Sequence, residues 1–196
     1  MELRPIEDRK TWYERELLST FPPHECKPLE DIEEQIARGC YKLIGFWEGE
    51  ELLGYAGLWS RPEQPEVVLL DYLGVTAARR NGGVGSKILR QLEQMYAGWA
   101  MLLAEAEAPD GGGEDGLRRR RIGFYLRCGF RELYDVGNCG ARFRALLMGP
   151  APEDRAALAA AHRAIYGPRR TDVKIPLGPE EEPPEPPYWM KGAETL

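Results

Sequence analysis

Seven consecutive residues carry the clearest chemical signal in this sequence: Arg80, Asn81, Gly82, Gly83, Val84, Gly85 and Ser86. They follow the apolar run VVLLDYLGV and precede an amphipathic segment. Closely spaced glycines let the backbone turn tightly and point several N–H groups at one spot, and a helix N-terminus adds about half a positive charge there. A turn of this kind binds phosphate groups mainly through its main chain, and the flanking Arg79 and Lys87 would add positive charge.

Two familiar phosphate-binding motifs fit this turn poorly. A Walker loop ends in Gly-Lys-Ser/Thr, whereas Ser86 stands here between Gly85 and Lys87. A dinucleotide fingerprint could start at Gly83, but Ile88 occupies the position of its third glycine. The turn therefore indicates a phosphate ligand of another kind, or only a tight connection between a strand and a helix.

Ionisable residues within apolar segments are the candidates for acid–base chemistry. Asp71 interrupts the apolar run, and a carboxylate there is costly without a partner, so it is either functional or a structural hydrogen-bond acceptor. Glu105 and Glu107 alternate on a second apolar segment. The four consecutive arginines Arg118–Arg121 cannot share one helix face, so some would bind an anion or pair with the acidic residues just before them.

The elements that must position these residues follow from hydrophobic periodicity. Helices are expected over residues 7–18, 29–38, 84–99 and 117–128. Strands are expected at residues 3–6, 67–75, 101–106, 131–136 and 141–148, with a hairpin over 41–60 that turns at Gly49. The run at 67–75 is the most apolar and should be a central strand. The glycine turn then lies at the end of a central strand, where a helix begins.

The C-terminal region has a different composition. Residues 153–166 are rich in alanine and predict a helix, and beyond them the stretch PEEEPPEPPYWM predicts an extended, polyproline-like tail. This tail is either a loose terminus or docks on the domain or on a second copy, which would cover Tyr188 and Trp189. We therefore expect a domain over residues 1–149 and a C-terminal helix and tail over 150–196, with a homodimer if the tail docks on a second copy.

Two motifs together resemble the GNAT-type N-acetyltransferase family. The first is Arg80-x-x-Gly83-x-Gly85 after the central strand. The second is the segment IGFYLRCGF at residues 122–130, which matches the family's habitual Tyr-x-x-x-Gly-Phe ending of the next helix. The order of the expected elements over about residues 1–148 agrees as well. The resemblance implies an α/β fold (α+β by some schemes) with a mixed, mostly antiparallel central sheet flanked by helices.

The resemblance also implies a co-substrate and where it binds. Acetyl-CoA, or another acyl-CoA, would place its pyrophosphate on the backbone of residues 80–86. Its pantetheine arm would pair with Leu73, Gly74 and Val75 like an added strand, and one N–H of these residues would stabilise the oxyanion. Gly74 is a candidate for a bulge that opens the sheet.

The reaction also needs a general acid and a general base. The resemblance implies that Tyr125 is the general acid for the leaving thiolate. The base is left open between Asp71 and the pair Glu105 and Glu107, with the loop residue His24 as a weaker alternative. Strand alternation would place Asp71 on the same face as its neighbours two and four residues on.

Charge supports two ligands of opposite sign. The net charge of -6 argues against a general nucleic-acid binder. Residues 79–131 are nevertheless basic, which suits a polyanionic co-substrate, and residues 1–78 are acidic. Acidic side chains expected near the acceptor would suit a cationic amine, or form an ordinary solvated face; they are Glu25, Glu30, Asp31, Glu33 and Glu34.

These observations predict an N-acetyltransferase that moves an acetyl group from acetyl-CoA to a primary amine of a small molecule or peptide, by direct attack in a ternary complex. Two alternatives are a non-catalytic acyl-CoA-binding module and a toxin-like enzyme that acetylates aminoacyl-tRNA through the basic span. The four scattered cysteines lack zinc-site spacing, so no metal is expected. We also expect a cytoplasmic protein without a membrane segment, because no long apolar run occurs.

Overall fold

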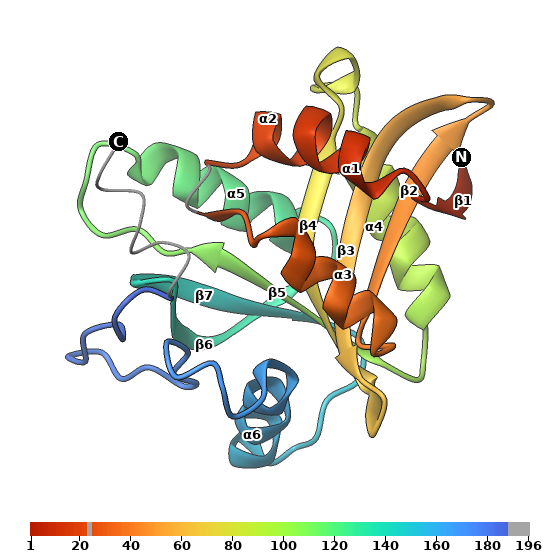
Figure 1. Cartoon of the computed structure of the whole chain (residues 1–196). Coiled ribbons are helices and arrows are strands. Elements are labelled where there is room, and N and C mark those ends of the chain that lie inside the picture. Colours follow the sequence, from red (N-terminus) through yellow and green to blue (C-terminus); the bar gives the residue numbers. More distant parts are fainter. Residues whose placement is uncertain (23–24, 188–196) are drawn as a thin grey trace.

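A seven-stranded sheet forms the centre of the structure, a computed structural model that describes residues 1–22 and 25–187 (Figure 1). The strands lie in the order β1-β2-β3-β4-β5-β7-β6, and β4 and β5 are the one parallel pair among them. Their bounds are β1 Glu2–Pro5, β2 Tyr41–Glu48, β3 Glu51–Arg61, β4 Gln64–Val75, β5 Met101–Glu107, β6 Arg131–Asn138 and β7 Ala141–Met148. The mixed, mostly antiparallel sheet is thus confirmed.

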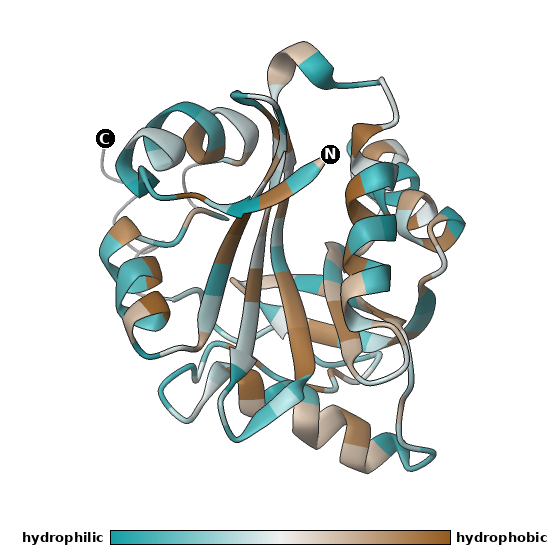
Figure 2. Cartoon of the chain, turned by 90° about the vertical axis from the view of Figure 1, so that its right-hand side faces the viewer, coloured by the Kyte–Doolittle hydropathy of each residue, from teal (hydrophilic) through white to brown (hydrophobic). Residues whose placement is uncertain are grey.

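Helices cover both faces of the sheet (Figures 1 and 2). One face carries α1 (Arg9–Trp12), a π-helical turn (Tyr13–Leu17), α2 (Leu18–Thr20), α3 (Leu29–Ala37) and α6 (Arg155–Tyr166). The other carries α4 (Val84–Tyr96) and α5 (Asp115–Arg127). A single turn of 3-10 helix (Ala77–Arg79) lies between β4 and the glycine turn. Each face therefore has its own apolar core, and the sheet separates the two.

The buried face of α4 differs from the expected one at its C-terminal end. Val84, Ile88 and Leu92 are buried as predicted. The helix ends at Tyr96, which is buried, so the predicted extension to residue 99 is wrong and Trp99 is 52% exposed. The left-handed Gly98 follows the helix end.

The C-terminal region packs against the domain as far as residue 187. Asp154 caps α6, its carboxylate accepting the N–H of Ala156 at 2.8 Å. Beyond α6 the chain crosses the edge strand β6, to which it is joined by backbone hydrogen bonds of Lys174 with Gly137 and of Leu177 with Asp135. The Arg142 guanidinium, from the neighbouring strand β7, donates to three carbonyls of this segment, those of residues 178, 179 and 181. Pro184 lies directly over Gly137 of β6. The described part of the tail therefore docks on its own domain, whereas Tyr188 and Trp189 lie outside the described residues.

None of the helices in the ranges 1–22 and 25–187 is both long and apolar enough to cross a membrane.

Candidate active site

A cleft opens where β4 and β5 separate. The two strands pair only from Val67↔Met101 to Leu70↔Ala104, although β4 continues to Val75 and β5 to Glu107 (Figure 1). Past Leu70, the backbone of β4 on this side faces the cleft instead of β5. The cleft has a volume of about 730 Å³ and is lined by residues of both strands, the glycine turn and α5. Because alternate N–H and C=O groups of a strand point to one side, this stretch can pair with an extended ligand.

A β-bulge at Asp71 shapes the wall of the cleft. Leu58 pairs with Leu70 and Gly57 with Tyr72, which leaves Asp71 as the extra residue of β4. The predicted bulge at Gly74 is wrong, because pairing there is regular. Gly74 is instead required by close packing, since a Cβ would lie 2.1 Å from Cζ of the buried Tyr55.

The bulge also turns the Asp71 side chain. Its carboxylate forms an ion pair with Lys27 and accepts a hydrogen bond from the Tyr41 hydroxyl at 3.0 Å. Tyr41 belongs to the core beneath α3, whereas Leu73 and Val75 pack on the core beneath α4. The prediction that Asp71 shares a face with those two residues is therefore wrong, because a bulge breaks strand alternation.

The glycine turn has the backbone that its sequence predicted. Gly83 is in the left-handed region, with φ of +71°, and stands at the N-cap of α4. No side chain caps the helix there. Asn81 also has a positive φ. Arg80 braces the turn, because its guanidinium donates to the Val75 carbonyl and to Thr20 Oγ1. The first N–H groups of α4 are therefore available for an anion.

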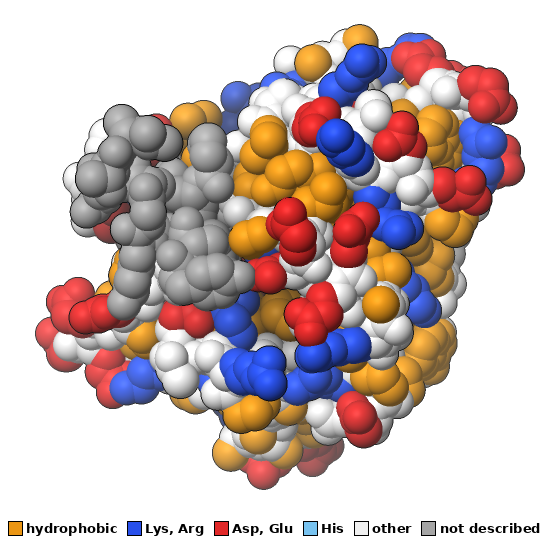
Figure 3. Space-filling view, viewed as in Figure 1, with side chains coloured by type: hydrophobic (Ala, Val, Ile, Leu, Met, Phe, Trp, Pro, Cys, Tyr) orange, Lys and Arg blue, Asp and Glu red, His pale blue; other side chains and the backbone are white. Residues whose placement is uncertain are grey.

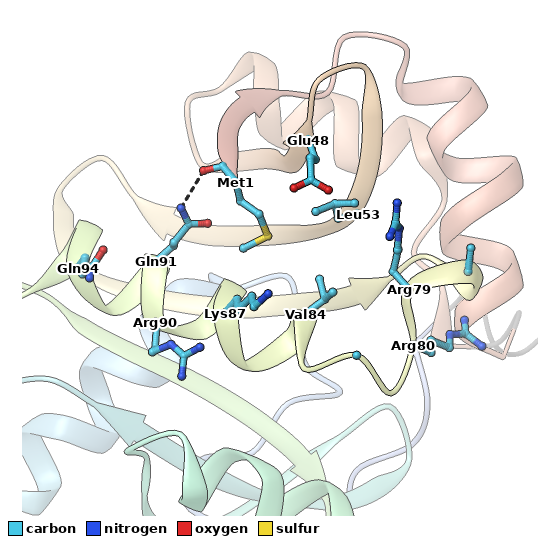
Figure 4. A pocket seen from close by; sticks show the side chains of 12 residues that line it. Met1, Glu48, Leu53, Arg79, Arg80, Val84, Lys87, Arg90, Gln91 and Gln94 are labelled. Carbon is cyan, nitrogen blue, oxygen red and sulfur yellow. Dashed lines mark hydrogen bonds between the residues drawn. The ribbon is translucent and has the colours of Figure 1, made fainter.

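Most residues of the turn line the cleft: Arg80, Asn81, Gly83, Val84, Gly85 and Ser86. Gly82 and Lys87 instead line a separate hollow of about 560 Å³ on the outer side of the turn, between α4 and the β2–β3 hairpin (Figure 4). In this view Lys87 extends from α4 toward the hollow that Glu48 lines from the hairpin. Lys87 does not line the cleft, and its expected contribution of charge to the phosphate site stays a prediction. Arg79 lines both hollows and donates to the Glu51 carboxylate.

The four arginines of α5 divide into two pairs. Arg118 contacts Glu107 at 2.7 Å and also pairs with Asp110, and Arg119 contacts Asp115 at 3.0 Å. Arg120 and Arg121 line the cleft. The predicted pairing with acidic residues is therefore confirmed for Arg118 and Arg119, and Glu107 is neutralised by an arginine. Anion binding by Arg120 and Arg121 stays a prediction.

Tyr125 lies on α5 with its side chain buried in the wall of the cleft. Its ring packs edge-on against Phe124 and Phe130, at centroid distances of 5.4 and 5.2 Å. No hydrogen bond joins its hydroxyl to another of the described residues, so it is not a tyrosine tied to the backbone. Burial raises the pKa of Tyr125 to about 12, which keeps the phenol protonated at neutral pH.

Comparisons with known proteins agree with this geometry. The family model described as the acetyltransferase (GNAT) family matches residues 9–130, which include the glycine turn, β5 and Tyr125. The chain belongs to the GNAT acetyltransferase family. No curated protein has a sequence that matches it.

Solved structures of GNAT proteins share the fold. One from Bacteroides thetaiotaomicron, assigned to the GNAT family, has a TM-score of 0.66 at 21% identity, over 83% of this chain and 95% of that one. An aminoglycoside 6'-N-acetyltransferase complexed with coenzyme A has a TM-score of 0.59 at 16% identity, over 78% and 100%. The ribosomal-protein-S18-alanine N-acetyltransferase from Escherichia coli has a TM-score of 0.56 at 15% identity, over 78% and 97%. At these identities the likeness concerns the fold.

At one end of the cleft, Glu105 of β5 is surrounded by residues of this GNAT protein that follow residue 130. Glu105 lines that end; its carboxylate accepts a hydrogen bond from Asn138 at 2.8 Å and lies 3.1 Å from His162 Nε2. His162 is fully buried on α6. Tyr166 and Arg170 line the same end. Sequence reasoning missed these partners, because they lie beyond the family motifs and only the fold brings them to β5.

The environment of Glu105 keeps it ionised. Burial alone would raise its pKa, but contacts with His162, Asn138 and Tyr166 outweigh burial and lower the pKa below its ordinary value. Glu105 is therefore a carboxylate at neutral pH, and no lysine or arginine forms an ion pair with it within the ranges the structure describes.

The acidic residues of the N-terminal region are dispersed. Glu25 lines the cleft, and Asp31 and Glu34 line a second groove nearby. Glu30 and Glu33 line neither, so the expectation that all five border one acceptor site is wrong. His24 lies outside the described residues. Within those residues no group of three or more His, Cys, Asp or Glu side chains could hold a metal ion.

Proposed function

We propose that this GNAT protein is an N-acetyltransferase that moves an acetyl group from acetyl-CoA to a primary amine of a small molecule or peptide, within a ternary complex. The observation that carries the proposal is the cleft itself. The glycine turn and the N-terminus of α4 lie at one end, the open edge of β4 runs along the cleft, and buried carboxylates lie at the other end. These three surfaces, in this order along the cleft, suit a long polyanionic thioester at one end and a small amine at the other.

The residues present fit acetyl-CoA, which supplies a thioester whose C–S bond breaks as the C–N bond of the amide forms. The N-terminus of α4 and the backbone of residues 80–86 would hold the pyrophosphate, with Arg120 and Arg121 as further cations. The backbone of Leu73, Gly74 and Val75 would pair with the pantetheine arm, and an N–H of this stretch would stabilise the oxyanion.

Two proton transfers must accompany this exchange, and the site offers a group for each. Tyr125, protonated and free of other hydrogen bonds to the described residues, would give its proton to the sulfur and regain one from solvent. Glu105, ionised and close to the acceptor end, would take the proton of the amine, directly or through a water molecule. Asp71 is the weaker candidate for the base, because Lys27 already neutralises it.

Thiol release from acetyl-CoA, measured against a panel of amines, tests the proposal. Tyr125→Phe keeps the ring packing and should lower kcat about 100-fold to 10,000-fold, the usual contribution of general acid–base catalysis. Tyr96→Phe is the matched control, since this buried tyrosine lies at the far end of α4 and does not line the cleft; its kcat should not change.

Three results would contradict the proposal in different ways. Undiminished turnover by Tyr125→Phe would remove Tyr125 from the mechanism. Tight CoA binding with no thiol release for any amine would indicate a non-catalytic acyl-CoA-binding module. Acetylation of aminoacyl-tRNA alone, with a strong salt dependence, would indicate a nucleic-acid substrate instead.

A further inference from the structure

We propose that the acceptor of this protein carries an anionic group at the end opposite its amine, and that a groove between α3 and residues 167–170 binds that group. The inference rests on the proposed N-acetyltransferase function and names the class of its acceptor. The acceptor would then be a dipolar molecule, such as an amino acid with a separated amine and carboxylate.

The groove adjoins the acceptor end of the cleft. It has a volume of about 410 Å³ and shares Lys27, Tyr166 and Arg170 with the cleft. Figure 3 shows a hollow over the gap between α3 and α6, with acidic side chains along its upper edge and lysine or arginine side chains along its lower edge. A molecule whose amine lies beside Glu105 would therefore extend past the shared residues into the groove.

The charge of the groove favours an anion. Five cationic side chains and two carboxylates line it among the described residues; they are Lys27, Arg38, Arg61, Arg169, Arg170, Asp31 and Glu34. The carboxylates Asp71 and Asp172 lie against Lys27 and Arg170, and still leave the groove with a net positive charge. The protein as a whole has a net charge of -6, so this local excess runs against the general trend.

The cationic edge is held in place by the C-terminus of α6. Arg61 donates from Nε to the Ala164 carbonyl at 3.2 Å. Arg163 donates to the carbonyls of Gly167 and Arg170, at 2.9 and 2.8 Å, which fixes the loop between them. The Arg170 guanidinium lies over the Tyr166 ring, 5.2 Å from its centroid. An anion would therefore meet cations whose backbone is already ordered, which lowers the entropy cost of binding.

The acceptor end of the cleft has the opposite, negative charge. Glu25, Asp71 and Glu105 line the acceptor end of the cleft, and of these Glu105 has no cationic lysine or arginine beside it in the described structure. An ammonium group would be attracted there before it loses its proton. Carboxylates at the inner end and arginines at the outer end thus select a molecule with both charges.

Matched straight-chain amines of increasing length test this selection. Each chain ends in a carboxylate, a phosphate, a methyl group or a second ammonium group, and kcat/KM is measured by thiol release with acetyl-CoA. We expect one chain length at which an anionic end gives a higher kcat/KM than methyl, and ammonium a lower one. The carboxylate and phosphate series show which anion the groove prefers. Equal kcat/KM for methyl and both anionic ends at every length would overturn the proposal.

Substitutions at the outer edge locate the effect. Arg169 is exposed and lines the groove, so Arg169→Gln should reduce the preference for an anionic end about threefold to tenfold, and Arg169→Glu should abolish it. Arg155→Gln, an exposed arginine at the other end of α6, is the control and should keep the preference. An unchanged preference in Arg169→Glu would refute the assignment of the groove.

Calorimetric binding of the same amines to the CoA-bound protein separates this proposal from the proposed function. If no amine is acetylated, the proposed N-acetyltransferase function fails. Tighter binding of anion-ended amines than of methyl-ended ones, with the difference lost in Arg169→Glu, would still support the proposal that the groove binds an anion. If methyl-ended amines are acetylated and bind as tightly as anion-ended ones, the function stands and the groove proposal fails. Absence of binding by every amine would also overturn the groove proposal.

Discussion

Gly83 allows the phosphate-binding turn to be tested with a very small change. Its φ of +71° lies in the left-handed region, and a Cβ built on it would have no neighbour within 4 Å. Gly83→Ala therefore adds no steric clash and changes only the conformational preference of the backbone. Alanine in this region costs about 1 to 2 kcal/mol relative to glycine.

This cost must appear either in folding or in ligand binding. Gly83 is exposed and no atom lies within 4 Å of its Cβ position, so in the free protein the alanine variant can relax toward a negative φ even though Arg80 braces the start of the turn. CoA must then restore the left-handed turn to gather its N–H groups, and about 1 to 2 kcal/mol corresponds to a fivefold to thirtyfold loss of affinity. We expect a loss in this range with little change in the free energy of unfolding. Gly83→Val should lose more, because a β-branched residue strongly avoids this region.

Gly98 provides the control at the other end of the same helix. Its φ is +77° and its Cβ position is also open, so Gly98→Ala imposes the same backbone cost away from the cleft. Isothermal titration with CoA and urea unfolding measure the two quantities for each variant. If Gly83→Ala and Gly83→Val bind CoA as tightly as the matching Gly98 variants, the turn does not hold the phosphates and its assignment is refuted.

Three further predictions concern buried charge and the docked tail. Glu105 has a lower pKa in the folded protein than its unfolded value of about 4.3, so its ionised form stabilises the fold above that pH. Glu105→Gln should therefore lower the free energy of unfolding in urea at neutral pH, and the difference from the wild type should shrink as the pH falls below about 4.3. A difference that stays constant with pH would contradict this prediction. Asp71→Asn should lower the free energy of unfolding by about 3 to 5 kcal/mol, because Lys27 is left buried without its counter-charge, and a loss under about 1 kcal/mol would show that water already screens the pair. Arg142→Ala should loosen the tail after residue 177 and speed its limited proteolysis while β-sheet circular dichroism stays unchanged; equal cleavage rates would show that Arg142 does not hold the tail.

Local sequence signals predicted the glycine turn and the helix that carries Tyr125, because local geometry determines both. A left-handed residue at the N-cap of a helix favours glycine, so the backbone of Gly83 could be predicted from the glycine spacing alone. Tyr125 followed from the same kind of signal, being four residues before Gly129 at the end of one helix. The order of strands and helices also followed from periodicity, but two helix predictions differ from the structure: α4 is shorter than predicted, and a π-helical turn interrupts the helix predicted over residues 7–18.

The parts that sequence could not predict depend on register and on distant contacts. The bulge at Asp71 arises from how β3 and β4 pair, and alternation in β4 alone cannot reveal it. The contact of Glu105 with His162 joins residues of β5 and α6, which are separated in the chain by α5, β6 and β7. Charge counts along the chain could not show which acidic side chains lie together, for the same reason. Glu30 and Glu33 are close to Asp31 in sequence but do not line the groove that Asp31 lines.

This division has a consequence for specificity. The end of the cleft that would hold CoA is built from β4, the glycine turn and α5, all within residues that the family model matches. The end that would hold the acceptor takes Asn138, Tyr166 and Arg170 from beyond that match, and hydrogen bonds of Asn138 with Tyr166 and Arg170 join them. A single chain can therefore keep the common co-substrate site while its C-terminal region sets the shape and charge of the acceptor site. Exchanging residues 150–187 between GNAT proteins that carry such an extension should change acceptor choice and leave CoA affinity unchanged.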